Sequence, residues 1–121
     1  MTATKSTKQI FNSELGEFID RSPTPFHAVS TMSAMLTEAG FSALSEADDW
    51  SLQQGGKYFV TRNGSSLIAF IVGTDGLAET GIRMAGAHTD SPCLKIKPQP
   101  DLQRLHYAQL GVEVYGGALL H

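Results

Sequence analysis

The segment 86–93, Gly-Ala-His-Thr-Asp-Ser-Pro-Cys, gathers histidine, aspartate, serine and cysteine in one short stretch. In an extended backbone, residues two apart project to the same face, so His88 and Asp90 can be neighbours. Asp90 could then accept the proton on Nδ1 of the imidazole and leave Nε2 to act as a base or a metal ligand. A carboxylate behind a ligating imidazole recurs around zinc, because it fixes the tautomer of the ring. The segment is therefore a candidate metal site.

The same residues have other interpretations. Asp90 or Ser91 could simply cap backbone N–H groups in a turn, and on spacing alone this turn is favoured, because a single His-x-Asp is a weak motif. Cys93 could be a nucleophile paired with His88, as in cysteine hydrolases. Its apolar neighbours instead indicate a thiol packed in a core. Ser91 lacks the Gly-x-Ser-x-Gly context of a serine hydrolase.

Other polar residues carry less chemistry. His27 is expected on a helix surface or near that helix's N-terminus, and His106 is expected to be solvated in a polar loop. Residues 115–117, Tyr-Gly-Gly, follow a strand and suit either a tight bend or a close approach to a ligand, but they lack the pattern of a phosphate loop. Tyr115, together with Glu113 and His121, could approach the site, although the sequence does not place these side chains.

Two helices are predicted before this segment. Residues 1–8 are expected to be a disordered lead-in, and apolar residues at helical spacing then predict a first helix that ends near Arg21. A second helix is predicted from Pro25, with the Thr24 hydroxyl as its N-cap. Gly40 is expected to end it in a left-handed conformation, which lets the next residue pack back on the helix.

Strand-forming residues dominate the rest of the chain. A β-hairpin is predicted from two apolar runs joined by an Asn-Gly turn, and Trp50 is expected to cover part of the core from the loop before it. A short, mostly buried strand is expected to lead into His88, after a loop. Two half-buried strands follow. In chain order, the predicted strands cover residues 58–61, 66–72, 82–87, 94–97 and 110–115.

These elements predict an α/β fold in which N-terminal helices pack on a mixed β-sheet. The length of 121 residues suits one compact unit, and 41% hydrophobic residues can supply a core. The chain ends on an apolar strand and turn without a polar tail, which suggests a sequence cut short.

Charge and cysteine usage exclude several functions. The net charge is −3, so there is no basic field for nucleic acid to bind. No apolar run approaches the ~18 to 20 residues that cross a bilayer, which argues against a membrane partner. The single cysteine cannot form an internal disulfide and the N-terminus has no hydrophobic secretion core, so a cytoplasmic location is expected.

Five segments together resemble the start of the aspartyl aminopeptidase family, the two-metal zinc aminopeptidases related to vacuolar aminopeptidase I. They occur in the family's order and span roughly residues 15–121, so the chain resembles an N-terminal portion of a zinc-exopeptidase catalytic domain, covering residues 9–121. The five are Ser-Pro-Thr-Pro-Phe-His-Ala at 22–28, Gly-Phe at 40–41, Gly-Gly-Lys-Tyr-Phe-Val-Thr-Arg-Asn at 55–63, Gly-Ala-His-Thr-Asp-Ser-Pro-Cys-Leu-Lys at 86–95, and Gln-Leu-Gly-Val-Glu-Val-Tyr-Gly-Gly at 109–117.

The resemblance implies that His88 is a metal ligand and that Asp90 belongs to the catalytic site as the residue that orients it. It further implies two zinc ions in each complete site and a metal-bridging water that releases the N-terminal residue, often an acidic one, from peptides. The remaining ligands, the general base and an inserted domain that drives homo-oligomer assembly would lie beyond this sequence. We therefore expect the 121 residues alone to bind zinc weakly, to hydrolyse nothing and to self-associate. The alternatives are a non-catalytic interaction module and a cysteine hydrolase that uses Cys93 and His88.

Overall fold

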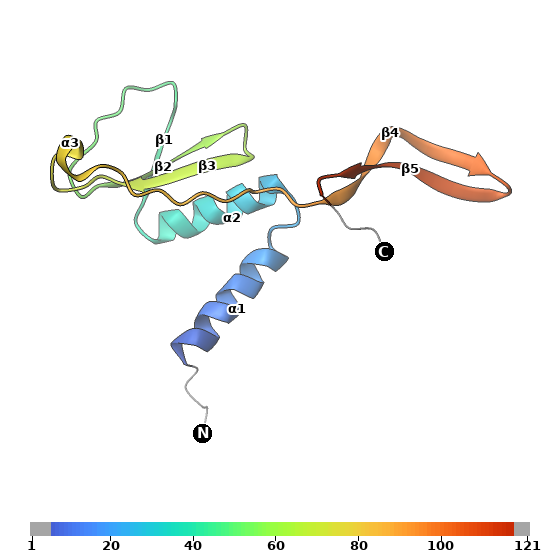
Figure 1. The fold of residues 1–121 in the computed structure, drawn as a ribbon, viewed down its shortest axis with the longest axis horizontal. Helices are drawn as coiled ribbons and strands as arrows, with labels where there is room; N and C mark the ends of the chain where they lie inside the picture. The colour runs from blue at the N-terminus through green and yellow to red at the C-terminus, as the bar shows by residue number, and fades with distance from the viewer. Residues whose placement is uncertain (1–5, 118–121) are drawn as a thin grey trace. The chain divides into compact units, whose positions relative to one another are not determined.

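A computed structural model of the chain describes residues 6–117, apart from the side chain of Leu77. The chain divides into two compact units, residues 1–89 and residues 90–121 (Figure 1). The length had suggested one compact unit, but the last two strands make their pairing contacts with each other. That residues 9–121 form part of one catalytic domain stays a prediction.

The first helix, α1 (Thr7–Asp20), begins two residues before its expected start. Ser6 and Gln9 form a capping box, in which the Gln9 N–H donates to Ser6 Oγ at 3.3 Å and the Ser6 N–H donates to Gln9 Oε1 at 2.8 Å. These bonds satisfy N–H groups that the first turn of a helix leaves without partners. None of the residues of α1 is buried.

The second helix, α2 (Pro25–Glu38), has both of its predicted ends. Thr24 Oγ1 accepts the His27 N–H at 3.4 Å, and Pro25 occupies the first helical position. Gly40 has a φ of +80°, and the Phe41 N–H donates to the Leu36 carbonyl at 2.9 Å. This bond is the 6→1 contact of a Schellman motif, so the predicted stop at Gly40 is confirmed.

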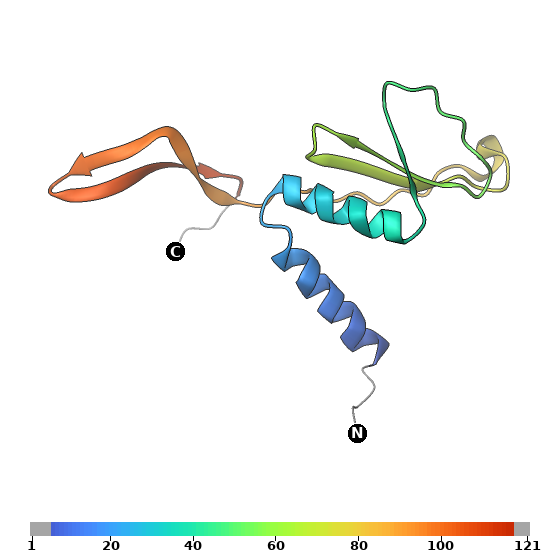
Figure 2. The same ribbon diagram turned by 180° about the vertical axis from the view of Figure 1, so that it is seen from behind.

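A three-stranded mixed sheet follows, with strand order β1-β2-β3. It consists of β1 (Ser42–Leu44), which runs parallel to β2 (Lys57–Arg62), and of β3 (Ser66–Ile71), which is antiparallel to β2. Helix α2 lies along this sheet (Figures 1 and 2). The small core comprises Ala28 and Val29 from α2 together with Phe59 and Val60 from β2. The expected fold class, helices combined with a mixed sheet, is therefore confirmed, with α2 on the sheet and α1 in contact with α2. Strand β1 was not predicted.

The predicted hairpin and its aromatic cover are both present. Asn63 and Gly64 have positive φ angles of 52° and 63°, as a type I′ turn requires. Tyr58 and Phe70 are direct partners across β2 and β3, with ring centroids 5.7 Å apart. Trp50 stacks on Phe70 at 6.2 Å from the preceding loop, so it covers the sheet as expected.

The strand predicted over residues 82–87 is wrong. A short helix, α3 (Leu77–Thr80), lies where a loop was expected, and residues 81–88 then have no regular secondary structure. Ile82 is 71% exposed and Met84 is 88% exposed. A strand needs a neighbour for its backbone hydrogen bonds, and within residues 6–117 no strand pairs with this segment.

The second unit is an antiparallel hairpin of β4 (Cys93–Arg104) and β5 (Tyr107–Tyr115), with a register irregularity between Ile96 and Asp101. Both strands were predicted, although they are longer than expected. The predicted half-burial is wrong, because the apolar side chains of both strands are exposed: Leu94, Ile96, Leu110, Val112 and Val114. A two-stranded ribbon has no second layer of its own to cover them.

No helix in the described part of the chain is long and apolar enough to cross a membrane.

Candidate metal centre

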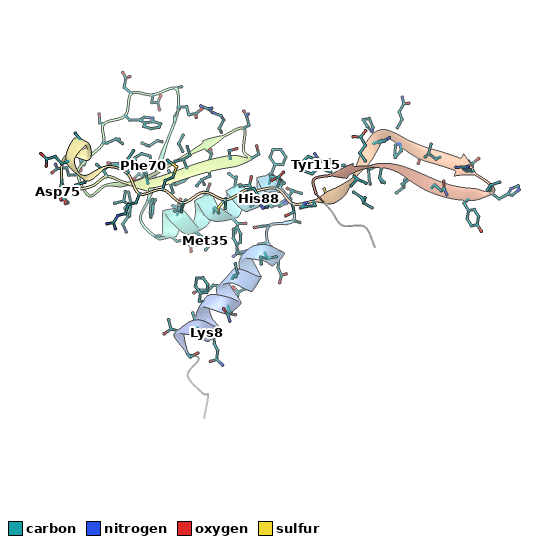
Figure 3. The ribbon with its side chains drawn as sticks, viewed as in Figure 1. Lys8, Met35, Phe70, Asp75, His88 and Tyr115 are labelled. Atoms are coloured by element: carbon teal, nitrogen blue, oxygen red, sulfur yellow. The ribbon has the colours of Figure 1, made fainter. Side chains whose placement is uncertain are left out.

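His88 lies near the end of the first unit (Figure 3). Its side chain is exposed rather than buried among aliphatic groups. The next residue ties this segment to the hairpin of β2 and β3. Thr89 is half-buried, and its Oγ1 donates to the Ser65 carbonyl at 2.8 Å, in the turn that precedes β3. The backbone beside His88 is therefore held against the rest of the first unit by a side-chain hydrogen bond rather than by strand pairing.

Asp90 is half-buried at the start of the second unit. Its Oδ2 accepts a hydrogen bond from the Tyr115 hydroxyl at 2.6 Å. This bond, together with the negative charge of the carboxylate, raises the pKa of Tyr115 above its ordinary value, because both favour the neutral phenol. Lys95 Nζ lies 4.2 Å from the centroid of the same ring. Asp90 thus lies within a small polar cluster at the base of the hairpin.

The sequence had left Tyr115 without a place. The hairpin register, which the sequence pattern does not give, pairs Tyr115 with Cys93 and so brings it back to the neighbourhood of Asp90. Because His88 and Asp90 fall in different units, the orientation of the imidazole by Asp90 stays a prediction.

Cys93 is exposed at the start of β4, so the prediction of a thiol packed in a core is wrong. The reason is the uncovered hairpin, whose apolar side chains form no interior around the thiol. Ser91 is also exposed. His27 behaves as expected at the start of α2, where its Nδ1 lies 2.8 Å from Thr24 Oγ1. His106 is exposed at the tip of the hairpin, as predicted for a solvated residue.

The other candidate residues near the C-terminal end have different structural roles. Glu113 lies in β5 and forms a long ion pair with Lys97, with 3.9 Å between Oε1 and Nζ. Gly116 has a φ of +79°, and a Cβ added there would lie 3.1 Å from Pro92 Cα. The Tyr-Gly-Gly segment therefore makes a tight bend against its own chain. His121 lies outside the described residues.

The described donors fit only part of a zinc site. A zinc ion takes three or four protein ligands, and two ions need more. Among residues 6–117 no group of three or more His, Cys, Asp or Glu side chains could hold a metal ion. His88 offers one suitable ligand, an exposed imidazole followed two residues later by a hydrogen-bonded carboxylate. A zinc centre would therefore need ligands beyond these.

The sequence of this chain matches one protein family and several curated relatives. The aminopeptidase I zinc metalloprotease (M18) family matches residues 18–121. A "probable M18 family aminopeptidase 2" of Pseudomonas savastanoi pv. phaseolicola is 58% identical over 109 residues, which cover 90% of this chain and 25% of that protein. The chain thus spans about a quarter of the length of the curated relatives it matches.

Solved structures agree in fold. The structure of mApe1 from Chaetomium thermophilum matches with a TM-score of 0.80 and 40% identity, covering 92% of this chain and 26% of that one. The mApe1 dodecamer from S. cerevisiae matches with a TM-score of 0.76 and 35% identity, covering 91% and 26%. The resemblance found in the sequence is confirmed. Since the family match extends over most of its residues, this chain belongs to the aminopeptidase I zinc metalloprotease (M18) family.

Proposed function

We propose that this chain supplies the first metal ligand, His88, and its orienting carboxylate, Asp90, to a zinc aminopeptidase that removes N-terminal residues from peptides. The observation that carries the proposal is the exposed imidazole of His88, in a segment that falls within the family match over residues 18–121. An imidazole that binds zinc through Nε2 must be accessible and must carry its proton on Nδ1. Exposure meets the first requirement, and a carboxylate two residues along can meet the second.

The roles of these two residues follow from their chemistry. Zinc, when bound, supplies a Lewis acid that polarises a peptide carbonyl and lowers the pKa of water. His88 contributes a neutral nitrogen ligand. Asp90 keeps Nδ1 of His88 protonated and orients the imidazole ring. Neither residue can perform the reaction without the further ligands that a zinc site requires.

We further propose that the 121 residues alone bind zinc weakly and hydrolyse nothing. The described part of the chain has no three-ligand cluster, and the curated relatives are about four times as long. In a complete site we propose two metal ions and a preference for acidic N-terminal residues, the latter on the family resemblance alone. Homo-oligomer formation is proposed because the S. cerevisiae relative is a dodecamer, and a cytoplasmic location because the single cysteine cannot form an internal disulfide.

A chimera tests the proposal. Residues 1–121 are joined to the remaining three quarters of the P. savastanoi relative, and release of aminomethylcoumarin from Asp, Glu, Leu and Arg substrates is followed with and without zinc. We expect zinc-dependent activity, greatest on Asp and Glu, and no activity from the 121-residue chain. A chimera that folds and binds zinc but releases no residue would contradict the proposal.

Two matched histidine variants assign the ligand. His88→Asn should reduce activity by more than about 100-fold, beyond the roughly 10- to 100-fold that loss of an orienting partner costs. His106→Asn should leave activity unchanged, because His106 is exposed at the hairpin tip and Asn tolerates its φ of +67°. Equal activity of the two variants would remove His88 from the site.

The alternative cysteine hydrolase gives the opposite pattern. Its activity would survive a chelator and disappear on Cys93→Ala. The zinc enzyme would lose activity with the chelator and keep it in Cys93→Ala. An interaction module would show neither response.

A further inference from the structure

The phenol of Tyr115 is placed against Asp90 by the register of the second unit. Cys93 and Tyr115 pair at the open end of the β4–β5 hairpin. The end of β5 therefore lies beside the short segment that leads from Asp90 into β4. The Tyr115 hydroxyl donates to Asp90 Oδ2 at 2.6 Å, across 25 residues of sequence.

Two further contacts hold the ring in this position. Lys95 Nζ lies 4.2 Å from the ring centroid, which is a favourable cation–π distance. Gly116 turns the backbone immediately after the ring, and a Cβ there would lie 3.1 Å from Pro92 Cα. Tyr115 is thus held by Lys95 at the face of its ring, by the bend at Gly116 in its backbone, and by Asp90 at its hydroxyl.

The hydrogen bond between Tyr115 and Asp90 is short. The separation of 2.6 Å lies at the short end of O–H···O hydrogen bonds, so the phenol holds Oδ2 closely. A carboxylate has acceptor positions on both oxygens. The Tyr115 hydroxyl thus fixes one oxygen of the Asp90 carboxylate by a direct contact.

We propose that Tyr115 is a positioning residue that fixes the Asp90 carboxylate, the group to which the proposed function gives the task of orienting His88. This inference rests on the proposed function, in which His88 is the metal ligand. Tyr115 contacts neither metal nor substrate in this proposal. It acts through Asp90, and its removal should alter the tautomer of His88 rather than the recognition of peptides.

The first test uses the 121-residue chain without metal. Nitrogen-15 NMR at pH 8 measures the ratio of the Nδ1–H and Nε2–H tautomers of His88 in the wild type, Tyr115→Phe and Tyr107→Phe. Tyr115→Phe removes only the hydroxyl and keeps the ring under Lys95, while Tyr107→Phe removes the hydroxyl at the other end of β5. We expect mainly Nδ1–H in the wild type and in Tyr107→Phe, and a shift of about 3-fold or more toward Nε2–H in Tyr115→Phe. An unchanged ratio in Tyr115→Phe, or a wild type that is mainly Nε2–H, would overturn the proposal.

The chimera gives a second, separable readout. Tyr115→Phe should weaken zinc binding by roughly 3- to 10-fold and lower kcat, with KM for the peptide unchanged, while Tyr107→Phe matches the wild type. A change in KM alone would contradict a positioning role. If the wild-type chimera is inactive while Tyr115→Phe still shifts the tautomer in the isolated chain, the peptidase function fails and the positioning of Asp90 stands.

Discussion

The same substitution, glycine to alanine, should have opposite effects at two positions of the first unit. Gly16 lies inside α1, and Gly40 follows α2 with a φ of +80°. A Cβ added at either position would meet no heavy atom within 4 Å. Packing therefore contributes nothing at either site, and backbone conformation alone determines the sign.

The magnitudes follow from that conformation. Alanine in a left-handed backbone costs about 1–2 kcal/mol, so Gly40→Ala should lower the free energy of unfolding by that amount. Alanine in a helix interior is more stable than glycine by roughly 0.5–1 kcal/mol, so Gly16→Ala should raise it. With a urea m-value of about 1 kcal/mol/M, the unfolding midpoint should fall by ~1–2 M in Gly40→Ala and rise by ~0.5–1 M in Gly16→Ala.

Urea denaturation followed by two probes measures both effects. Far-ultraviolet circular dichroism reports on the helices, and fluorescence of Trp50, the single tryptophan, reports on the sheet against which it stacks. Gly40→Ala should shift the midpoint in both signals, because α2 packs on that sheet. If Gly40→Ala is neutral or stabilising, the left-handed stop of α2 is refuted.

The remaining predictions concern the second unit. Gly116→Ala should disorder the base of the hairpin, because the new Cβ would lie 3.1 Å from Pro92 Cα and Gly116 has a positive φ. Loss of the Tyr115 hydroxyl signal in NMR would show this disorder, and an intact signal would argue against it. The contact with Asp90 raises the pKa of Tyr115, so it stabilises the hairpin fully at pH values below the pKa of an unfolded tyrosine, near 10, and this stabilisation is lost as the pH rises through the folded pKa. Ultraviolet titration should show one tyrosine that ionises late in the wild type and at the ordinary pH in Asp90→Asn. The exposed thiol of Cys93 should react with Ellman's reagent in the folded chain about as fast as in urea, and strong protection would show that it is covered. The apolar side chains exposed on β4 and β5 should drive self-association, which sedimentation velocity would detect as a concentration-dependent coefficient and a constant monomer would exclude.

Short-range interactions explain which parts of the fold could be predicted from the sequence. The Thr24 cap, the stop at Gly40 and the turn at Asn63 each depend on residues within about five positions of one another. Their backbone conformations have low energy for those residue types wherever the segment lies. The sequence therefore determined the ends of α2 and the hairpin of β2 and β3, and its collinear motifs determined the family.

Long-range pairing decided the rest. The alternation of residues 94–97 predicted strands but not their exposure, because burial depends on whether a second layer covers the hairpin. Residues 82–87 have the composition of a strand, yet a strand forms only where a neighbour accepts its backbone hydrogen bonds. The parallel pairing of β1 with β2, and the contact of Tyr115 with Asp90 across 25 residues, follow from register, which local composition does not encode. Only the tertiary structure could therefore place a tyrosine behind the carboxylate that the sequence had already singled out.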